Sequence, residues 1–197
     1  MKRLSKDFYM QDALTLSREL LGKVLVHETE DGIIKGRIVE TEAYMGAIDP
    51  ASHAYQNRKT ARTSVMFEDG GIAYVYLIYG MYNCMNVVAN KKDIAQACLI
   101  RALEPIEGIE IMKKNRKMDK LKNLCNGPGK LCMALGITKA QHGADLITSP
   151  LYIEEPKDSA PFEVITSKRI NIDYAGEAKD YPWRFLIKDS PYISVKP

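Results

Sequence analysis

The sequence of 197 residues contains no run of 18 apolar residues, the length that a helix needs to cross a membrane. Basic residues open the chain, but no apolar stretch follows them, which argues against a secretory signal. Four widely spaced cysteines are too few for a disulfide framework in a chain of this size. These absences predict a soluble, cytoplasmic protein that does not bind a membrane.

Features of a metal site are also scarce. The sequence has no Cys-x-x-Cys pair, and its three histidines form no His-x-His or His-x-x-x-His pattern. Cys125, Cys132 and His142 remain as candidate zinc ligands, but reduced thiols in the hydrophobic core are the better interpretation. We therefore expect neither a metal ion nor any other cofactor.

The charge balance is only weakly basic, with 28 lysines and arginines against 25 acidic residues and a net charge of +3. A net charge of this size does not establish a polyanionic partner, because electrostatic attraction depends on local charge. Basic residues do cluster at positions 113–122, 58–62 and 168–169. Such clusters are most often solvated faces or helix ends.

Hydrophobic residues make up 46% of the sequence and charged residues 27%, which is typical of a globular domain. β-Prone runs separated by short turns predict hairpins, and Asp12 is placed to cap the first helix. We expect an α+β fold: a single domain, residues 1–197, with a mostly antiparallel, curved β-sheet, flanking helices and a protruding β-hairpin. The expected helices are 12–21, 104–121 and 130–135, and the expected strands are 23–28, 33–44, 72–78, 82–89, 97–103, 151–155, 162–165, 170–172 and 184–187.

Residues 45–71 form a polar stretch that is longer than an ordinary connection between elements. One of the basic clusters lies within it. Long loops in compact domains usually carry function, so we expect this loop to contribute to a binding or active site.

Two carboxylates face the same side of an otherwise apolar strand. Because side chains alternate along a strand, Glu40, Glu42 and Tyr44 share one face. Glutamate is depleted in strands and rarely buried without a partner, so this pair needs an explanation. Three explanations are open here: ion pairs at a sheet edge, a general base whose pKa is raised by burial, or the two carboxyl groups of a sugar hydrolase.

Four tyrosines fall within residues 74–82. Part of this run belongs in the core, because aromatic residues favour strands. Tyr79 is different, since it precedes Gly80 at the expected hairpin tip, where a large ring is hard to bury within its own domain. An aromatic ring that projects from a tip is suited to insertion into a stack of bases.

Two polar residues interrupt apolar strands, Asn86 within 85–88 and Arg101 within 99–102. If buried, each needs hydrogen-bond partners. Arg101 is suited to neutralise a carboxylate such as Glu42. From the residues alone, an internal salt bridge and a contact with a ligand explain Arg101 equally well.

Several motifs together resemble one protein family. They are Arg-Ile-Val-Glu-Thr-Glu-Ala-Tyr at 37–44, Ala-Ser-His at 51–53, Tyr-Val-Tyr-Leu-Ile-Tyr-Gly-Met-Tyr at 74–82, Ile-Arg-Ala-Leu-Glu-Pro at 100–105, Leu-Cys-Asn-Gly-Pro-Gly-Lys-Leu at 124–131 and Pro-Trp-Arg-Phe at 182–185. In this order, and over nearly the whole chain, the sequence resembles the alkyladenine (3-methyladenine) DNA glycosylases. The resemblance implies a base-excision-repair enzyme that flips alkylated or deaminated purines out of duplex DNA and hydrolyses their N-glycosidic bond.

The resemblance also implies catalytic roles. Glu42 matches the glutamate that activates the attacking water, and Arg101 matches an arginine near that water. Ile170 would bind the same water through its main-chain carbonyl. Because no lysine nucleophile is needed, we expect a monofunctional glycosylase that hydrolyses the base without cutting the strand, and no metal is needed either.

Binding roles follow from the same resemblance. Tyr79 matches the tyrosine that enters the duplex where the damaged nucleotide leaves. Tyr44, His53 and Tyr76 match residues that enclose the flipped base. Asn86 matches a residue at the pocket floor that screens bases. A purine alkylated at N3 or N7 is a cation, and tyrosine rings stabilise a cation between them.

Two other classes remain open at this point, a non-catalytic nucleic-acid-binding domain and a carbohydrate glycoside hydrolase that uses Glu40 and Glu42. Release of free base from methylated duplex DNA distinguishes all three. The expected partner is double-stranded DNA that contains damaged purines, and 3-methyladenine, 7-methylguanine and hypoxanthine are the expected damaged bases. Because single-domain glycosylases need no second subunit, we expect a monomer.

Overall fold

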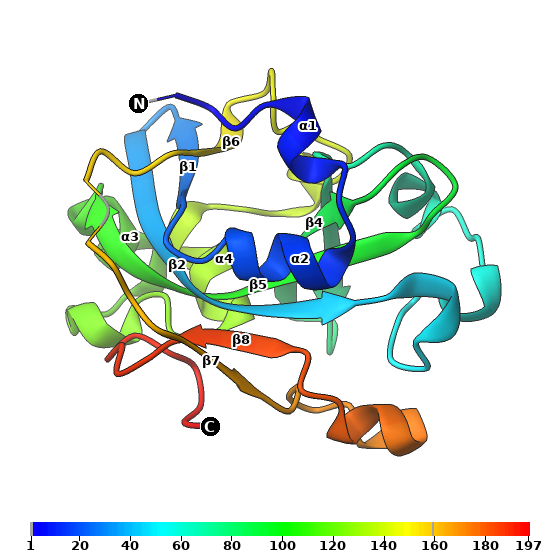
Figure 1. Ribbon diagram of the computed structural model, residues 1–197. Coiled ribbons are helices and arrows are strands. Elements are labelled where there is room, and N and C mark those ends of the chain that lie inside the picture. Colours follow the sequence, from blue (N-terminus) through cyan, green and yellow to red (C-terminus); the bar gives the residue numbers. More distant parts are fainter. Residues whose placement is uncertain (1, 159) are drawn as a thin grey trace.

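The computed structural model describes residues 2–158 and 160–197, and one long strand organises them (Figure 1). Strand β2 (Gly32–Tyr44) is antiparallel to β1 (Val24–Thr29), β5 (Gln96–Glu107) and β8 (Arg184–Ile187). β5 follows one edge of β2 along most of its length, whereas β1 and β8 pair with successive parts of the other edge. The middle of β2 is therefore flanked by strands on both sides.

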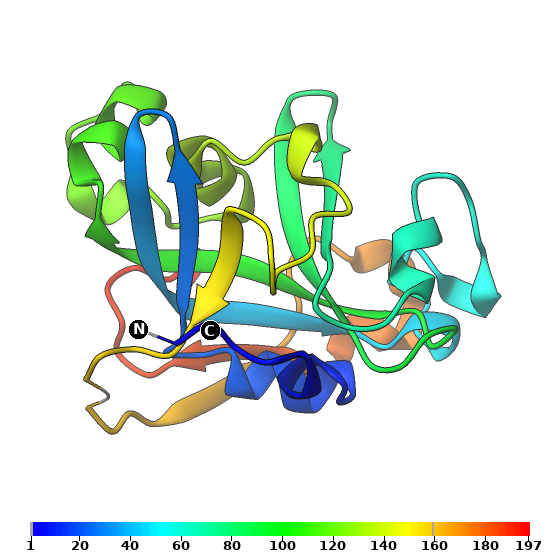
Figure 2. The ribbon, with the colours of Figure 1, turned by 90° about the horizontal axis from the view of Figure 1, so that it is seen from above.

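The remaining strands extend the sheet. Its order is β3-β4-β5-β2-β1-β6, with β7 paired to β8, and the added strands are β3 (Ala73–Ile78), β4 (Tyr82–Ala89), β6 (Leu151–Glu154) and β7 (Val164–Ser167). Each of these pairings is antiparallel. Seen from above, the β3–β4 hairpin stands out from the rest of the sheet (Figure 2). The predicted α+β fold with a mostly antiparallel sheet and a protruding hairpin is confirmed.

Helices cover both faces of the sheet where β2 and β5 pair. Helix α2 (Ala13–Glu19) lies on one side, and α3 (Ile109–Arg116) and α4 (Pro128–Leu135) lie on the other (Figures 1 and 2). As predicted, Asp12 caps α2, because its carboxylate accepts hydrogen bonds from the N–H groups of Leu14 and Thr15. Large, fully buried side chains of the core include Leu16, Leu20, Ile34, Ile38, Met85 and Ile100.

The loop at residues 45–71 is folded against the sheet by short helical turns. Its buried Met66 and Phe67 pack in one cluster with Tyr74 and Val88 of the hairpin strands. The short segments of the chain are α1 (Lys6–Tyr9) and the 3-10 turns η1 (Gly46–Ile48), η2 (Tyr55–Asn57), η3 (Ser64–Phe67), η4 (Leu121–Asn123), η5 (Lys139–Gln141) and η6 (Asp173–Asp180). No helix within the described ranges has the length and apolar character that crossing a membrane requires.

The helix predicted at 104–121 was wrong at both ends. Residues 104–107 continue strand β5, because the long strand β2 still offers backbone partners there, with Gly36 opposite Pro105. Pro105 signals a helix start in sequence, but at this position it coincides with an irregularity in the strand pairing. Gly108 then turns the chain with φ +73°, and a Cβ there would lie 2.6 Å from the Ile33 carbonyl oxygen. The helix α3 is only eight residues long.

The strand predicted at 170–172 was also wrong. Asn171 has φ +58°, which interrupts an extended backbone. The N–H of Ile170 donates to the carboxylate of Glu42 instead of to a neighbouring strand. Apolar residues at 170 and 172 imitate a strand pattern, but the segment is a loop that ends over the face of β2. The preceding strand, predicted at 162–165, is β7 at Val164–Ser167.

Candidate active site

A cleft of about 770 Å³ opens beside the β3–β4 hairpin. The end of β2, the hairpin, β5, the N-terminus of α4 and residues 170–174 line it. A smaller pocket shares part of this lining and reaches further toward the sheet. The predicted site residues that line one or both cavities are Tyr44, His53, Tyr76, Tyr79, Asn86, Arg101 and Ile170. The fold therefore brings together residues that are up to 126 positions apart in the sequence.

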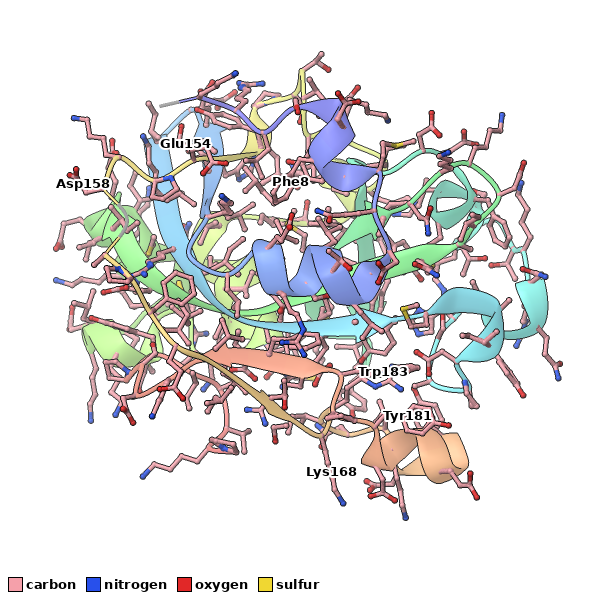
Figure 3. The ribbon with its side chains drawn as sticks, viewed as in Figure 1. Phe8, Glu154, Asp158, Lys168, Tyr181 and Trp183 are labelled. Carbon is pink, nitrogen blue, oxygen red and sulfur yellow. The ribbon has the colours of Figure 1, made fainter. Side chains whose placement is uncertain are left out.

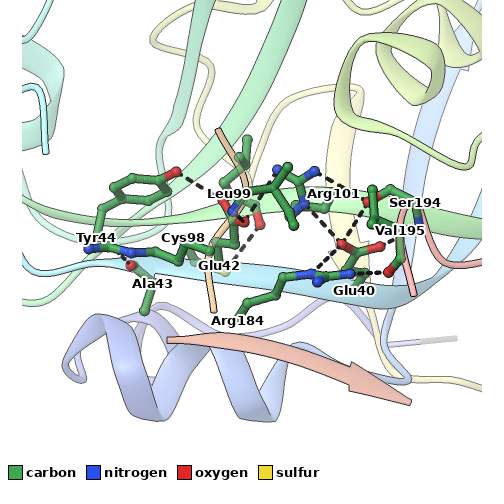
Figure 4. A network of polar contacts seen from close by, with 12 residues as sticks. Glu40, Glu42, Ala43, Tyr44, Cys98, Leu99, Arg101, Arg184, Ser194 and Val195 are labelled. Atoms are coloured by element: carbon green, nitrogen blue, oxygen red, sulfur yellow. Dashed lines mark hydrogen bonds and ion pairs between the residues drawn. The ribbon is translucent and has the colours of Figure 1, made fainter. Parts of the chain in front are cut away.

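Glu42 lies directly behind this lining and is fully buried. One carboxylate oxygen accepts the Ile170 N–H at 2.7 Å and lies 3.4 Å from Nη1 of Arg101. The other accepts the hydroxyl of Tyr44 at 2.9 Å (Figure 4). Ile170, Arg101 and Tyr44 all line the cleft, so the groups that contact Glu42 lie between it and the cavity. The contact of Ile170 is through its N–H, and the predicted role of its carbonyl stays a prediction.

Glu40 lies on the same face of β2, but its hydrogen-bond partners differ from those of Glu42. Its carboxylate accepts hydrogen bonds from Nε of Arg101 at 2.9 Å and from Nε of Arg184 at 2.8 Å. Ser194, near the C-terminus, adds its N–H at 2.6 Å and its hydroxyl at 2.7 Å. Arg184 also donates to the carbonyl of Val195 (Figure 4). Glu40 is thus held by two arginines and the C-terminal segment.

Arg101 joins the two glutamates. Its Nε contacts Glu40 and its Nη1 contacts Glu42, as expected if strand alternation places both carboxylates on one face. Burial works against the charge of Arg101, but Glu42 and Glu40 more than compensate, so its pKa is raised. Of the two explanations that the sequence left open for Arg101, the internal salt bridge is present, with Glu40 closer than Glu42, and Arg101 also lines the cleft.

Aromatic rings form the walls of the smaller pocket. The ring of His53 meets Tyr76 edge-on, with centroids 4.7 Å apart, and its Nδ1 is 2.8 Å from the hydroxyl of Tyr74. Tyr44 and Tyr174 complete the aromatic lining. Tyr74 was missed by sequence reasoning, because its alternation with Tyr76 is the ordinary pattern of a core strand. A pocket walled by tyrosines and one histidine is suited to a flat ring.

Burial also sets the protonation of these side chains. Burial, assisted by the nearby charge of Arg62, lowers the pKa of His53 to about 4. Burial raises the pKa of Tyr44 and of Tyr76 well above the usual value. At neutral pH the aromatic walls are therefore uncharged.

Asn86 lies on β4 and lines the smaller pocket. Its side chain is buried, and Nδ2 donates to the carbonyl of Tyr74 at 3.2 Å. It therefore has the internal hydrogen bond that a buried amide needs and also lines the cavity, and its role in screening bases stays a prediction. The internal bond fixes which part of the amide the pocket meets.

Tyr79 is at the tip of the β3–β4 hairpin, as predicted. Its side chain is 75% exposed, and the neighbouring Met81 is 66% exposed. Both Tyr79 and Gly80 have positive φ, and the N–H of Met81 donates to the carbonyl of Ile78 across the turn. A bulky residue in the left-handed region is unfavourable and often marks a functional position. The turn therefore presents an aromatic ring that the domain itself does not cover.

Sequence reasoning missed a buried ion pair next to the site. Arg169 and Asp49 are both fully buried in their side chains, and two N–O contacts of 2.5 and 2.8 Å join them. Lys168 points outward in Figure 3, so in the basic cluster at 168–169 Lys168 lies at the surface and Arg169 is buried. Asp49 precedes a proline in a polar loop, which gives no sign of burial. Only the tertiary fold places it against Arg169.

The lining of the cleft is basic. It includes Arg62, Arg116 and Lys130 as well as the buried Arg101. They come from the loop 45–71, from α3 and from the N-terminus of α4. Gly129 allows α4 to approach the hairpin, because a Cβ there would lie 2.9 Å from Cβ of Tyr82. These positive charges surround a cavity next to an exposed aromatic tip.

Candidate metal ligands do not gather in the described part of the chain, which contains no group of three or more His, Cys, Asp or Glu side chains arranged to hold an ion. All four cysteines are buried free thiols. Burial raises the pKa of Cys84 to about 11 and of Cys125 to about 12. They are core residues, as the sequence indicated.

Comparison with known proteins identifies the family. The model of the methylpurine-DNA glycosylase (MPG) family matches residues 7–191. The chain belongs to this family. A protein of Clostridium novyi named "Putative 3-methyladenine DNA glycosylase" is 53% identical over the full length of both chains. Proteins of the same name from Clostridium perfringens and Desulfitobacterium hafniense are each 50% identical, over 98% and 100% of this chain and 100% of their own lengths.

The predicted resemblance to the alkyladenine (3-methyladenine) DNA glycosylases is therefore confirmed. Membership of the methylpurine-DNA glycosylase family makes the protein a DNA glycosylase, an enzyme of base-excision repair that acts on DNA. The sugar hydrolase and the non-catalytic binding domain, which the sequence left open, are set aside. The roles of the individual site residues stay predictions.

Proposed function

We propose that the protein releases alkylated and deaminated purines, namely 3-methyladenine, 7-methylguanine and hypoxanthine, from duplex DNA. The main support for this proposal is the position of Glu42, which is buried behind a cleft whose walls are uncharged aromatic rings. The exposed ring of Tyr79 and the basic lining of the cleft support duplex DNA as the substrate. A base cannot be hydrolysed within the stack, so the nucleotide must first be flipped into the cleft.

In the proposed reaction, Glu42 acts as general base for a water molecule in the cleft. The water oxygen attacks C1′ of the sugar, its proton passes to Glu42, and the N-glycosidic bond breaks with its electron pair leaving on the base. The carboxylate also stabilises the positive charge that develops on the sugar. The products are a free base and an abasic site in an intact strand.

The neighbours of Glu42 hold it ready for this role. Ile170 and Tyr44 fix its two oxygens by hydrogen bonds, and Nη1 of Arg101 lies 3.4 Å from one of them. Glu40 is unsuited to the same task, because two arginines and Ser194 already occupy its carboxylate. We therefore assign Glu40 to the support of Arg101.

The pocket is suited to cationic purines as well as to neutral ones. His53 is neutral above about pH 4, so it adds no positive charge to the pocket. Tyrosine faces attract a cation by roughly 0.5 to 2 kcal/mol. A purine methylated at N3 or N7 carries such a charge and is also a good leaving group. A neutral purine such as hypoxanthine depends more on the enzyme for its departure.

Base release from defined duplexes tests the proposal. The parent protein is expected to release free 7-methylguanine and hypoxanthine, and Glu42→Gln is expected to lower the rate by at least about 100-fold, the usual contribution of a general base. The variant should still bind damaged duplex, since Gln keeps the size of the side chain. Activity of Glu42→Gln near the parent level would contradict the mechanism.

Glu40→Gln is the matched control, because it changes the same chemical group two positions away. We expect a smaller loss of rate, with reduced thermal stability from the weakened contact to Arg184. If Glu40→Gln lost activity and Glu42→Gln retained it, the assignment of the two glutamates would be reversed.

A further inference from the structure

The buried ion pair of Arg169 and Asp49 lies against the outer side of the aromatic pocket. The guanidinium carbon of Arg169 is 4.9 Å from the ring centroid of Tyr44 and 4.9 Å from that of Trp183. Its Nη1 also donates to the carbonyl of Ala43 at 3.0 Å. Figure 3 places Trp183 beside the start of β8, where the loop from η6 arrives. The guanidinium is therefore within cation–π distance of both rings.

Tyr44 separates this charge from the cavity. Its ring lines both the cleft and the smaller pocket, whereas Arg169 lines neither of them. A base in the pocket would thus have Tyr44 as one wall and a buried guanidinium behind that wall. A cation on the outer face of a ring repels a second cation on the inner face.

Asp49 is the group that cancels this charge. Each of its oxygens accepts a hydrogen bond from Arg169, and its side chain is fully buried. The same carboxylate accepts the N–H groups of Met45 and Ala51, which fixes it in the loop. Because both side chains are fully buried, solvent screens this pair only weakly, and the field of Arg169 at Tyr44 depends on the charge of Asp49.

The other buried charges near the cleft are balanced in the same way. Glu40, Glu42 and Asp49 are opposed by Arg101, Arg169 and Arg184, all of them buried. Each of the three arginines contacts at least one of the three acids. The loss of one charge therefore leaves an unopposed charge beside the pocket.

We propose that Asp49 and Arg169 set the preference of the pocket between cationic and neutral purines. Asp49 neutralises Arg169 behind Tyr44, which allows a cationic base to stack on the inner face of that ring. The proposal rests on the proposed function, since it concerns which damaged base the same pocket accepts. Asp49 and Arg169 touch neither base nor water and act through Tyr44.

Two single variants are expected to change the preference between the two bases in opposite directions. Asp49→Asn leaves an unopposed positive charge, so the ratio of kcat/KM for 7-methylguanine to that for hypoxanthine should fall. Arg169→Gln leaves an unopposed negative charge, so the same ratio should rise. A base stacked on the inner face of Tyr44 would lie roughly 8 Å from the guanidinium, and a unit charge at about that distance, in an effective dielectric of about 20, corresponds to roughly a thirtyfold change in the ratio. The double variant has no charge at either position and should keep the parent ratio.

The measurement uses two duplexes of identical sequence that differ only in the damaged base, with spontaneous loss of 7-methylguanine subtracted. Unfolded molecules release neither base, so the ratio reports only on the folded fraction of a destabilised variant. Asp180→Asn is the matched control, because it breaks the exposed ion pair of the adjacent Lys168 and should not change the ratio. If one single variant does not fold, the other still determines the sign.

A purely structural role for the pair would move both single variants in the same direction or leave the ratio unchanged, and either result would overturn the proposal. Release of neither base by the parent protein would refute the proposed function itself, and this inference with it. Release of both bases by the parent with unchanged ratios in the variants would refute the inference alone.

Discussion

Two glutamates two positions apart on one strand have opposite characters in this protein. Glu40 is enclosed by two arginines and Ser194, whereas Glu42 has a single distant guanidinium contact and two neutral hydrogen-bond donors. These surroundings support the proposed assignment, in which Glu40 anchors Arg101 and Glu42 accepts the proton of the attacking water.

At the same scale, Asn86 is expected to exclude undamaged guanine. Guanine carries a 2-amino group that adenine and hypoxanthine lack, and the buried amide of Asn86 is fixed toward the pocket by its bond to Tyr74. Asn86→Ser should therefore raise release of normal guanine relative to hypoxanthine, measured in one duplex context. An unchanged ratio in a folded variant would show that Asn86 is not the filter.

His53 is expected to link stability to pH. Its folded pKa of about 4 lies below the unfolded value of 6.5, so the unfolded chain binds a proton first as the pH falls. Stability from neutral His53 is complete above pH 6.5 and is lost as the pH falls toward 4. Between pH 7 and pH 5, the unfolding free energy of the parent should drop by about 1 kcal/mol more than that of His53→Gln, allowing for partial exposure.

Urea denaturation at a series of pH values measures this difference, and the baseline stability of each variant cancels because only the change with pH is compared. Parallel curves for the parent and His53→Gln would mean that His53 is protonated equally in the folded and unfolded states.

At the scale of elements, the β3–β4 hairpin carries an aromatic ring that contributes little to its own fold. Tyr79→Ala should leave the unfolding free energy within about 1 kcal/mol of the parent, because the side chain is 75% exposed. Binding to damaged duplex should weaken by about five- to a hundredfold, the range expected for loss of one stacking contact of about 1 to 3 kcal/mol. Tyr79→Phe keeps the ring and should bind like the parent.

Fluorescence anisotropy with a labelled duplex measures the affinity, and thermal denaturation measures the stability. A large loss of stability in Tyr79→Ala would mean that the ring belongs to the core of the hairpin.

The helices and strands differ in how well the sequence predicts them. The hairpins and the cap at Asp12 follow from local alternation and turn residues, and these were found nearly to the residue. The end of strand β5 at residue 107 depends on pairing with the edge of β2, and the loop at 170–172 depends on the carboxylate of Glu42. Both partners are distant in the sequence. Local pattern cannot reveal such partners.

The residues of the candidate site likewise include some that the sequence revealed and some that it did not. The strand that carries Glu40 and Glu42 and the tip that carries Tyr79 were recognisable from alternation, turn chemistry and family resemblance. Asp49 and Arg169 were not, because they are 120 positions apart and each resembles an ordinary surface charge in sequence. A buried ion pair is a property of the tertiary fold, and no spacing rule predicts it.

At the scale of the whole molecule, a net charge of only +3 conceals a strong local asymmetry. Arg62, Arg116 and Lys130 meet at one cleft from three separate segments, while many other lysines are paired with acids elsewhere on the surface. The mean charge therefore says little about DNA binding, and the arrangement of charges around the cleft is the relevant quantity.

Binding to duplex DNA should accordingly weaken as salt rises, because each phosphate contact releases counterions. Lys130 is exposed at the cleft, so Lys130→Ala should reduce the slope of log affinity against log salt by about one and weaken binding to damaged and undamaged duplex alike. Lys188→Ala is the matched control, since Lys188 pairs with Glu163 away from the cleft lining, and it should leave the slope unchanged. An affinity independent of salt in the parent, or equal slopes for the parent and Lys130→Ala, would mean that the cleft cations do not contact the phosphate backbone.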